Sequence, residues 1–124
     1  YMVVDNEAGM EHISRGILPS METAILVSDC SRRGVQAAGR IAQLIRECDL
    51  KPQTMGLIVN RAPGGVLNEG TKEEIEKQGL TLLGIVPQDE QVYEYDCDGK
   101  PTVSLPEDSP VKKAMREIVA KLNL

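Results

Sequence analysis

Four short apolar segments, spaced along the chain, constrain the fold more than any other feature of the sequence. They cover Met2–Asp5, Thr23–Ser28, Met55–Val59 and Leu80–Val86. None of them alternates strictly between apolar and polar residues, so each predicts a strand that is covered on both faces. Strands of this kind are typical of parallel sheets.

Amphipathic helices are predicted between these strands. Ser31 is a suitable N-cap for a helix that runs to about Cys48, because apolar residues recur there every three or four positions. Thr71 is predicted to cap a short acidic helix over Lys72–Gln78. A last helix is expected over Ser109–Leu124, with one apolar face.

Strand and helix therefore alternate along most of the chain, which predicts right-handed crossover connections. Residues 95–108 are rich in Asp, Gly and Pro and are predicted to form a loop with a short edge strand at Thr102–Leu105. The expected fold class is α/β, a mostly parallel sheet with helices on both faces. Residues 1–124 are expected to form a single domain.

The composition restricts the partners and the compartment. The net charge is −5 and no Lys/Arg-rich run occurs, which disfavours nucleic-acid binding. No apolar stretch approaches the about 18–20 residues of a membrane span, so no membrane partner is expected. The cysteines Cys30, Cys48 and Cys97 form no CxxC pair and indicate reduced thiols in a cytoplasmic protein. Because Tyr1 leads directly into a strand, we interpret the chain as a fragment cut inside a larger protein.

Polar residues follow each apolar segment. They are Asp5–Gly9, Asp29–Arg32, Asn60–Arg61 and Pro87–Asp89. In open α/β sheets, ligands bind at the carboxyl ends of the strands, so these residues are candidates for a nucleotide site. Every strand must also end in a polar loop, and position alone does not separate the two interpretations.

The segment Val3–Gly16 resembles the second switch segment of the MinD/ParA/nitrogenase iron protein class of P-loop ATPases. It is most similar to the CooC type, the ATPases that serve nickel insertion into carbon monoxide dehydrogenase, because Ala-Gly is followed by Glu-His and Arg-Gly. Ile58–Arg61 and Gly84–Pro87 stand where this class keeps its adenine-pocket segments. The resemblance extends over nearly the whole chain and implies a P-loop NTPase-like fold with ATP and Mg²⁺ as cofactors.

The resemblance also implies roles for individual residues. Asp5 would be the Walker B carboxylate, which holds Mg²⁺ through water. Gly9 would let a backbone N–H approach the γ-phosphate and distinguish ATP from ADP. Asn60 would offer its amide to the edge of adenine, with Arg61 beside it. Pro87 would pack on the base. Gln88 and Asp89, which follow it, are further candidates for binding the nucleotide.

The phosphate-binding loop itself is missing from the sequence. No GxxxxGK(S/T) segment occurs, so the N-terminal half of the family domain is expected upstream, and this fragment alone should not hydrolyse ATP. The cysteine pair that binds metal in the CooC type is also missing. The full-length protein is expected to form an ATP-dependent homodimer. Its expected client is apo carbon monoxide dehydrogenase or acetyl-CoA synthase, and its cargo is nickel.

Two alternatives stay open. One is another ATPase of the same class that acts in partitioning, division positioning or electron transfer. A division protein of this type would need a C-terminal helix that binds membranes, and the basic residues within Ser109–Leu124 allow a weak case for one. The other alternative is an α/β interaction module without enzymatic activity.

Overall fold

The computed structural model describes residue 3 and residues 21–122, and the Asp5–Gly9 segment lies outside this range. Strands and α-helices alternate from Thr23 to Cys97, and a last helix follows without a strand before it. The elements are β1 (Thr23–Ser28), α2 (Arg32–Glu47), β2 (Thr54–Ala62), η1 (Pro63–Gly65), α3 (Glu69–Lys77), β3 (Leu82–Pro87), α4 (Glu90–Cys97), η2 (Thr102–Ser104) and α5 (Pro110–Lys121).

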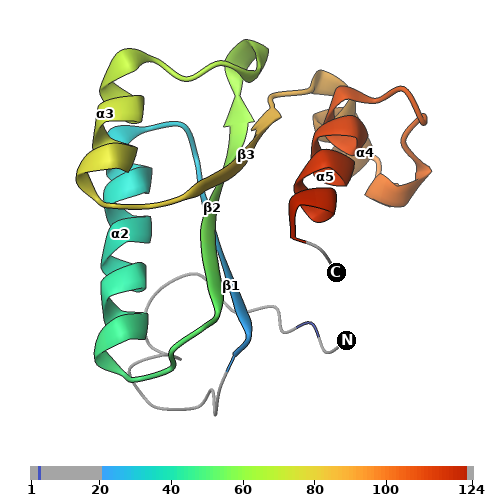
Figure 1. Ribbon diagram of the computed structural model, residues 1–124. Helices are drawn as coiled ribbons and strands as arrows, with labels where there is room; N and C mark the ends of the chain where they lie inside the picture. The colour runs from blue at the N-terminus through green and yellow to red at the C-terminus, as the bar shows by residue number, and fades with distance from the viewer. Residues whose placement is uncertain (1–2, 4–20, 123–124) are drawn as a thin grey trace.

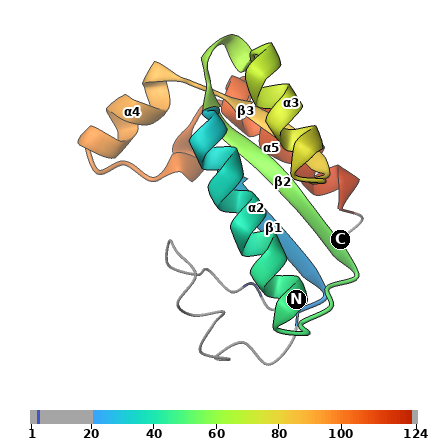
Figure 2. The same cartoon turned by 90° about the vertical axis from the view of Figure 1, so that its left-hand side faces the viewer.

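The described strands form one parallel sheet in the order β1-β2-β3. Helices α2 and α3 lie on one side of the sheet and α5 lies on the other (Figure 1). Helix α4 projects beyond the carboxyl end of β3, off the sheet (Figures 1 and 2). The predicted α/β class, with a parallel sheet and helices on both faces, is confirmed.

Two aliphatic clusters hold the layers together. The larger one joins β1 and β2 to α2, with Leu57 and Val35 fully buried at its centre. The smaller one lies on the opposite face, where Ile118 of α5 packs against Ile58 and Leu83. Gly56 belongs to this second face, because a Cβ built there would stand 2.4 Å from Leu83 Cγ. The buried residues of both clusters are aliphatic, and they pack closely without aromatic side chains.

Strand β1 departs from the prediction that both of its faces are covered. Ala24 and Leu26 are buried against α2, whereas Ile25 is 44% exposed and Val27 is 63% exposed. The reason is that α5 covers β3 and the adjoining part of β2, and among the described elements none lies over this face of β1.

The boundaries of two predicted elements need correction. Asn68, and not Thr71, caps α3: Asn68 Oδ1 accepts the Thr71 backbone N–H at 2.8 Å. The Thr71 hydroxyl instead donates to the Cys30 carbonyl at 2.8 Å and ties α3 to the loop after β1.

The predicted loop over residues 95–108 is also partly wrong, because α4 continues to Cys97. Thr102–Ser104 forms a 3₁₀ turn and no edge strand. The flanking Pro101 and Pro106 lack the N–H groups that a strand would need for pairing.

The border of the sheet at β3 is irregular. The pairing of β2 with β3 shifts register between Leu57 and Ile58. Lys121 reaches from the end of α5 and donates its Nζ to the Leu83 carbonyl at 3.0 Å. One backbone carbonyl of β3 is therefore hydrogen-bonded to a side chain and not to another strand.

Candidate functional site

A small cavity of about 210 Å³, open to solvent, lies at the carboxyl ends of β1 and β2. Val27, Ser28 and Asp29 line it from β1 and the loop that follows, and Asn60 and Arg61 line it from β2. This is the end of a parallel sheet at which ligands usually bind. The volume is smaller than the about 300–1,000 Å³ of complete small-molecule pockets, so these walls suit part of a ligand site.

Asn60 and Arg61 are held in an unusual local geometry. Asn60 Oδ1 accepts the backbone N–H of Arg61 at 3.0 Å. Arg61 has φ of 55°, in the left-handed region where a non-glycine residue carries strain on the order of 1 kcal/mol. Among the described residues no hydrogen bond engages the amide nitrogen of Asn60, so the side chain can donate to a ligand in the cavity.

Asp29 closes the first turn of α2. Its Oδ1 accepts the Ser31 hydroxyl at 2.5 Å and the Ser31 backbone N–H at 3.0 Å. The pKa of Asp29 lies below its ordinary value because of the Ser31 hydroxyl first, then the Ser31 backbone N–H, with the positive charge of Arg61 as a smaller contribution. Ser31 Oγ in turn accepts the Gly34 N–H at 3.0 Å. The α2 N-terminus is therefore capped by the chain itself.

The carboxyl end of β3 stands next to that of β2. Pro87 pairs in register with Ala62, and the Gln88 N–H donates to the Ala62 carbonyl at 2.9 Å. Asp89 caps α4, since its Oδ1 accepts the Gln91 N–H at 2.9 Å. Its Oδ2 is buried and has no hydrogen-bond partner within the described part of the chain.

The predicted site residues thus fall into two sets. The structure brings the Asn60–Arg61 pair and the Pro87–Asp89 segment to adjacent strand ends. Asp5 and Gly9, the predicted Mg²⁺ carboxylate and phosphate sensor, lie outside the described residues. Within residues 21–122 no group of three His, Cys, Asp or Glu side chains could hold a metal ion. In the same range, no helix combines the length and the hydropathy needed to cross a membrane.

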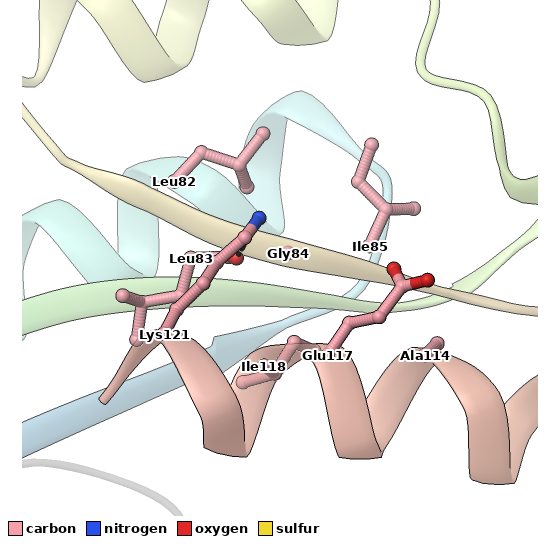
Figure 3. Close-up of a pocket in the computed structure, with 8 residues that line it drawn as sticks. All are labelled: Leu82, Leu83, Gly84, Ile85, Ala114, Glu117, Ile118 and Lys121. Atoms are coloured by element: carbon pink, nitrogen blue, oxygen red, sulfur yellow. Dashed lines mark hydrogen bonds between the residues drawn. The ribbon is translucent and has the colours of Figure 1, made fainter. Parts of the chain in front are cut away.

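A larger cavity, of about 310 Å³, lies elsewhere, between β3 and α5. Leu82, Gly84 and Ile118 contribute to its walls, and Figure 3 shows Glu117 and Lys121 extending from α5 toward the strand. Lys121 is already bonded to the Leu83 carbonyl. Since this groove lies along the side of β3 and away from the strand ends, it does not join the predicted site residues.

Comparison with known proteins places this geometry in a family context. No family model matches the chain. An uncharacterized ATP-binding protein of Methanocaldococcus jannaschii is 33% identical over 122 residues, which is 98% of this chain and 48% of the relative. The septum site-determining protein MinD of Bacillus subtilis is 28% identical over 82% of this chain and 39% of that protein. The carbon monoxide dehydrogenase accessory protein CooC of Rhodospirillum rubrum is 24% identical over 69% of this chain and 39% of that protein.

Solved structures give the same result for the fold. A ParA family ATPase from Chlorobium tepidum superimposes with a TM-score of 0.70 at 22% identity, over 93% of this chain and 46% of that one. The fold is that of the MinD/ParA ATPases. MinD from Pyrococcus horikoshii, solved as a complex with Mg-ADP, superimposes with a TM-score of 0.66 at 19% identity, over 82% of this chain and 41% of that one. The homologues of this chain are accordingly ATP-binding proteins of the MinD/ParA type. The chain spans about half the length of the curated relatives it matches.

The contacts of Asp29 at this strand end were not predicted from the sequence. Asp29 stands among the polar residues after β1, but its bonds to Ser31 and its proximity to Arg61 appear only in the structure. The Asp-x-Ser spacing at the start of α2 is a signal for this turn, because both side chains can accept backbone N–H groups. The left-handed Arg61 gave no comparable signal, since arginine rarely adopts that conformation.

Proposed function

We propose that this chain is the base-binding and phosphate-sensing half of an ATPase of the MinD/ParA class. The observation that carries the proposal is the cavity at the strand ends, which Asn60 lines with an amide nitrogen that no other described residue engages. The Pro87–Asp89 segment does not line this cavity but ends the neighbouring strand β3. An amide side chain can donate and accept at the same edge of a base, which suits adenine. Relatives described as ATP-binding proteins support the same ligand.

The proposed reaction uses residues outside the described range as well. Asp5 is assigned to the Mg²⁺ ion, which it would hold through a water molecule, and the ion would neutralise charge on the phosphates. Gly9 is assigned to the γ-phosphate, where a backbone N–H would distinguish ATP from ADP. Asn60, Arg61, Pro87, Gln88 and Asp89 would bind and orient the nucleoside. Because the lysine-bearing loop is missing from this sequence, hydrolysis is expected only in the full-length protein.

Titration calorimetry of the full-length protein with Mg-ATP tests this assignment. Asn60→Ala should weaken binding about tenfold, since the loss of hydrogen bonds worth ~1.4 kcal/mol changes the affinity by that factor. Asn68→Ser is the matched control, because it keeps a capping hydroxyl on α3 and should bind like the wild type. If the wild-type protein does not bind Mg-ATP, the nucleotide assignment is wrong and an interaction module becomes the better description.

For the cellular role we propose nickel insertion into apo carbon monoxide dehydrogenase or acetyl-CoA synthase by an ATP-dependent homodimer. The Val3–Gly16 segment and the CooC relative support this choice. The test is reconstitution: full-length protein with Mg-ATP should increase nickel incorporation into the apoenzyme, and an Asp5→Asn variant should not.

Division positioning is the competing role, favoured by the MinD relative from Bacillus subtilis. It would require a membrane-binding segment. Helix α5 does not suit that task, because its Ile118 is buried against the sheet at 2% exposure. The test is co-sedimentation of the full-length protein with anionic lipid vesicles in the presence of ATP. Binding to the vesicles would favour division positioning over nickel insertion.

A further inference from the structure

The negative charge of the chain is concentrated in one short segment, residues 89–98. This segment consists of α4 and its two capping residues, and it contains five carboxylates and no lysine, arginine or histidine. The whole sequence has 19 acidic and 14 basic residues, so outside this segment the two kinds balance. The field around α4 therefore accounts for the net charge of the chain.

Within α4 these charges are arranged unfavourably. Glu90 and Glu94 are about one helical turn apart, a spacing at which like charges repel each other. Asp96 lies in the last turn, where the helix dipole favours cations. The other described α-helices each have a basic residue in the last turn and bury at least one side chain, whereas α4 has neither. Since short helices are marginal in water without packing, α4 lacks the stabilisation that the others have.

The outward face of α4 combines these carboxylates with an aromatic ring. At about 100° per residue, Glu90, Tyr93 and Asp96 share one side of the helix. All three are exposed, and the ring of Tyr93 is 72% exposed. Helix α4 projects off the sheet, and its main described neighbour is η2 (Figures 1 and 2). An aromatic residue between two carboxylates is thus presented to solvent.

The same segment shows how a cation binds to a surface of this kind. Lys100 Nζ lies 5.5 Å from the centroid of the Tyr95 ring and 3.9 Å from Asp98 Oδ2. An aromatic face and a carboxylate three residues further along hold this cation together. Tyr93 and Asp96 repeat that spacing, and within the described part of the chain no cation lies over Tyr93.

We propose that the outward face of α4 is a docking site for an arginine-bearing segment of a partner protein, with a guanidinium over Tyr93 and between Glu90 and Asp96. Arginine fits this face because its planar group stacks on aromatic rings and donates two N–H groups to a carboxylate.

The charge of α4 argues against other ligands. An acidic field repels nucleic acids and anionic membranes, and two copies of a chain with net charge −5 repel each other. Within residues 21–122 no group of three carboxylate, cysteine or histidine side chains could hold a metal ion. The docking site is separate from nucleotide binding and holds whether or not the protein binds ATP.

Fluorescence anisotropy with the full-length protein and a labelled octa-arginine peptide tests the proposal. The wild type should bind the peptide, and Glu90→Gln/Asp96→Asn should weaken binding about tenfold, because two charge-assisted contacts are lost. The matched control, Glu73→Gln/Glu76→Gln, removes the same charge from α3 and should bind within about twofold of the wild type. All four positions are exposed, so both variants should fold.

Two further readouts act at single residues of the same face. Tyr93→Phe should bind octa-arginine like the wild type, whereas Tyr93→Ser should bind about threefold more weakly, as expected for loss of a cation–π contact at an exposed site. Cys97 is exposed one turn after Tyr93, so a maleimide should label it in the full-length protein. At about ten times the Kd of the peptide this labelling should slow roughly tenfold, while labelling of the exposed Cys48 should not change.

Four results would overturn the proposal. A wild-type protein that does not bind the peptide is the first. Equal losses of affinity in the α4 and α3 variants would show that the peptide responds to net charge alone. Absence of Cys97 labelling in the peptide-free, full-length protein would show that the rest of the polypeptide covers α4. A dimer in sedimentation experiments that Glu90→Gln/Asp96→Asn dissociates would assign the face to a second copy of the chain.

Discussion

A single methyl group added at Gly56 should destabilise the sheet. A Cβ at this position would stand 2.4 Å from Leu83 Cγ and within 2.8 Å of both of its terminal carbons. Leu83 is buried, and the branched centre of its side chain, which cannot simply swing aside, occupies the space. Overpacking of this kind costs about 1–3 kcal/mol, whereas alanine gains about 0.5–1 kcal/mol over glycine in a strand. The clash should win, with a net loss of about 1–2 kcal/mol for Gly56→Ala.

Urea denaturation followed by circular dichroism measures this loss, which corresponds to a midpoint about 0.5–1 M lower. Gly70→Ala is the control, since a Cβ there meets nothing closer than 3.4 Å and should leave the midpoint unchanged or raise it. Leu83→Ala alone should cost about 2–5 kcal/mol. The double variant Gly56→Ala/Leu83→Ala should cost less than the sum of the two single changes, because the new methyl fills part of the void. A stabilising Gly56→Ala, or additive single effects, would refute this account of the packing.

Three further perturbations probe the elements around the site. Thr71→Val removes the donor to the Cys30 carbonyl and should lower the free energy of unfolding by about 1–3 kcal/mol in urea titrations, and a loss below about 0.5 kcal/mol would show that the bond contributes little. Ile118→Ala should lower the free energy of unfolding by about 2–5 kcal/mol. In this variant the amides of α5 should exchange with solvent before those of β2. Exchange of both at the same rate would contradict a separate cluster under α5. Asp29 should titrate below its ordinary pKa of 3.8 in carboxyl NMR spectra, and Ser31→Ala should raise that pKa. Because the folded pKa is the lower one, ionised Asp29 stabilises the fold above pH ~4 and loses this effect as the pH falls through the folded pKa, so Asp29→Asn should flatten the pH dependence of stability in that range.

Most of the strands and helices that form the layers could be predicted from the sequence. Thr23–Ser28 and the helix from Arg32 were predicted because continuous apolar runs and a strong 3.6-residue period are direct consequences of burial. Helix α4 was missed because it buries none of its side chains, so no periodicity marks it. Its only local signal was Asp89 as an N-cap, and that residue was interpreted as part of the site.

Exposure of β1 could not be predicted from the chain itself. Ile25 and Val27 belong to an unbroken apolar run, which indicates burial on both faces. No described element packs on this face, and the residues of the strand itself carry no signal for that. For the candidate site, proximity of the β2 and β3 ends followed from their parallel order, but the left-handed backbone of Arg61 depends on the local register shift between Val59 and Ala62.

The hydrogen bond from Lys121 to the Leu83 carbonyl makes the two edges of the described sheet unequal. A strand border invites a neighbouring chain when its peptide groups are free and evenly spaced, and lysine side chains and irregular register both discourage such pairing. β3 carries both devices: a shifted ladder and a carbonyl held by Lys121. β1 at the opposite border pairs with β2 in unbroken register from Thr23 to Ser28. Among the described strands, β1 therefore offers the regular edge on which a further strand can pair, while the Lys121 contact and the shifted register of β3 disfavour edge-to-edge pairing there.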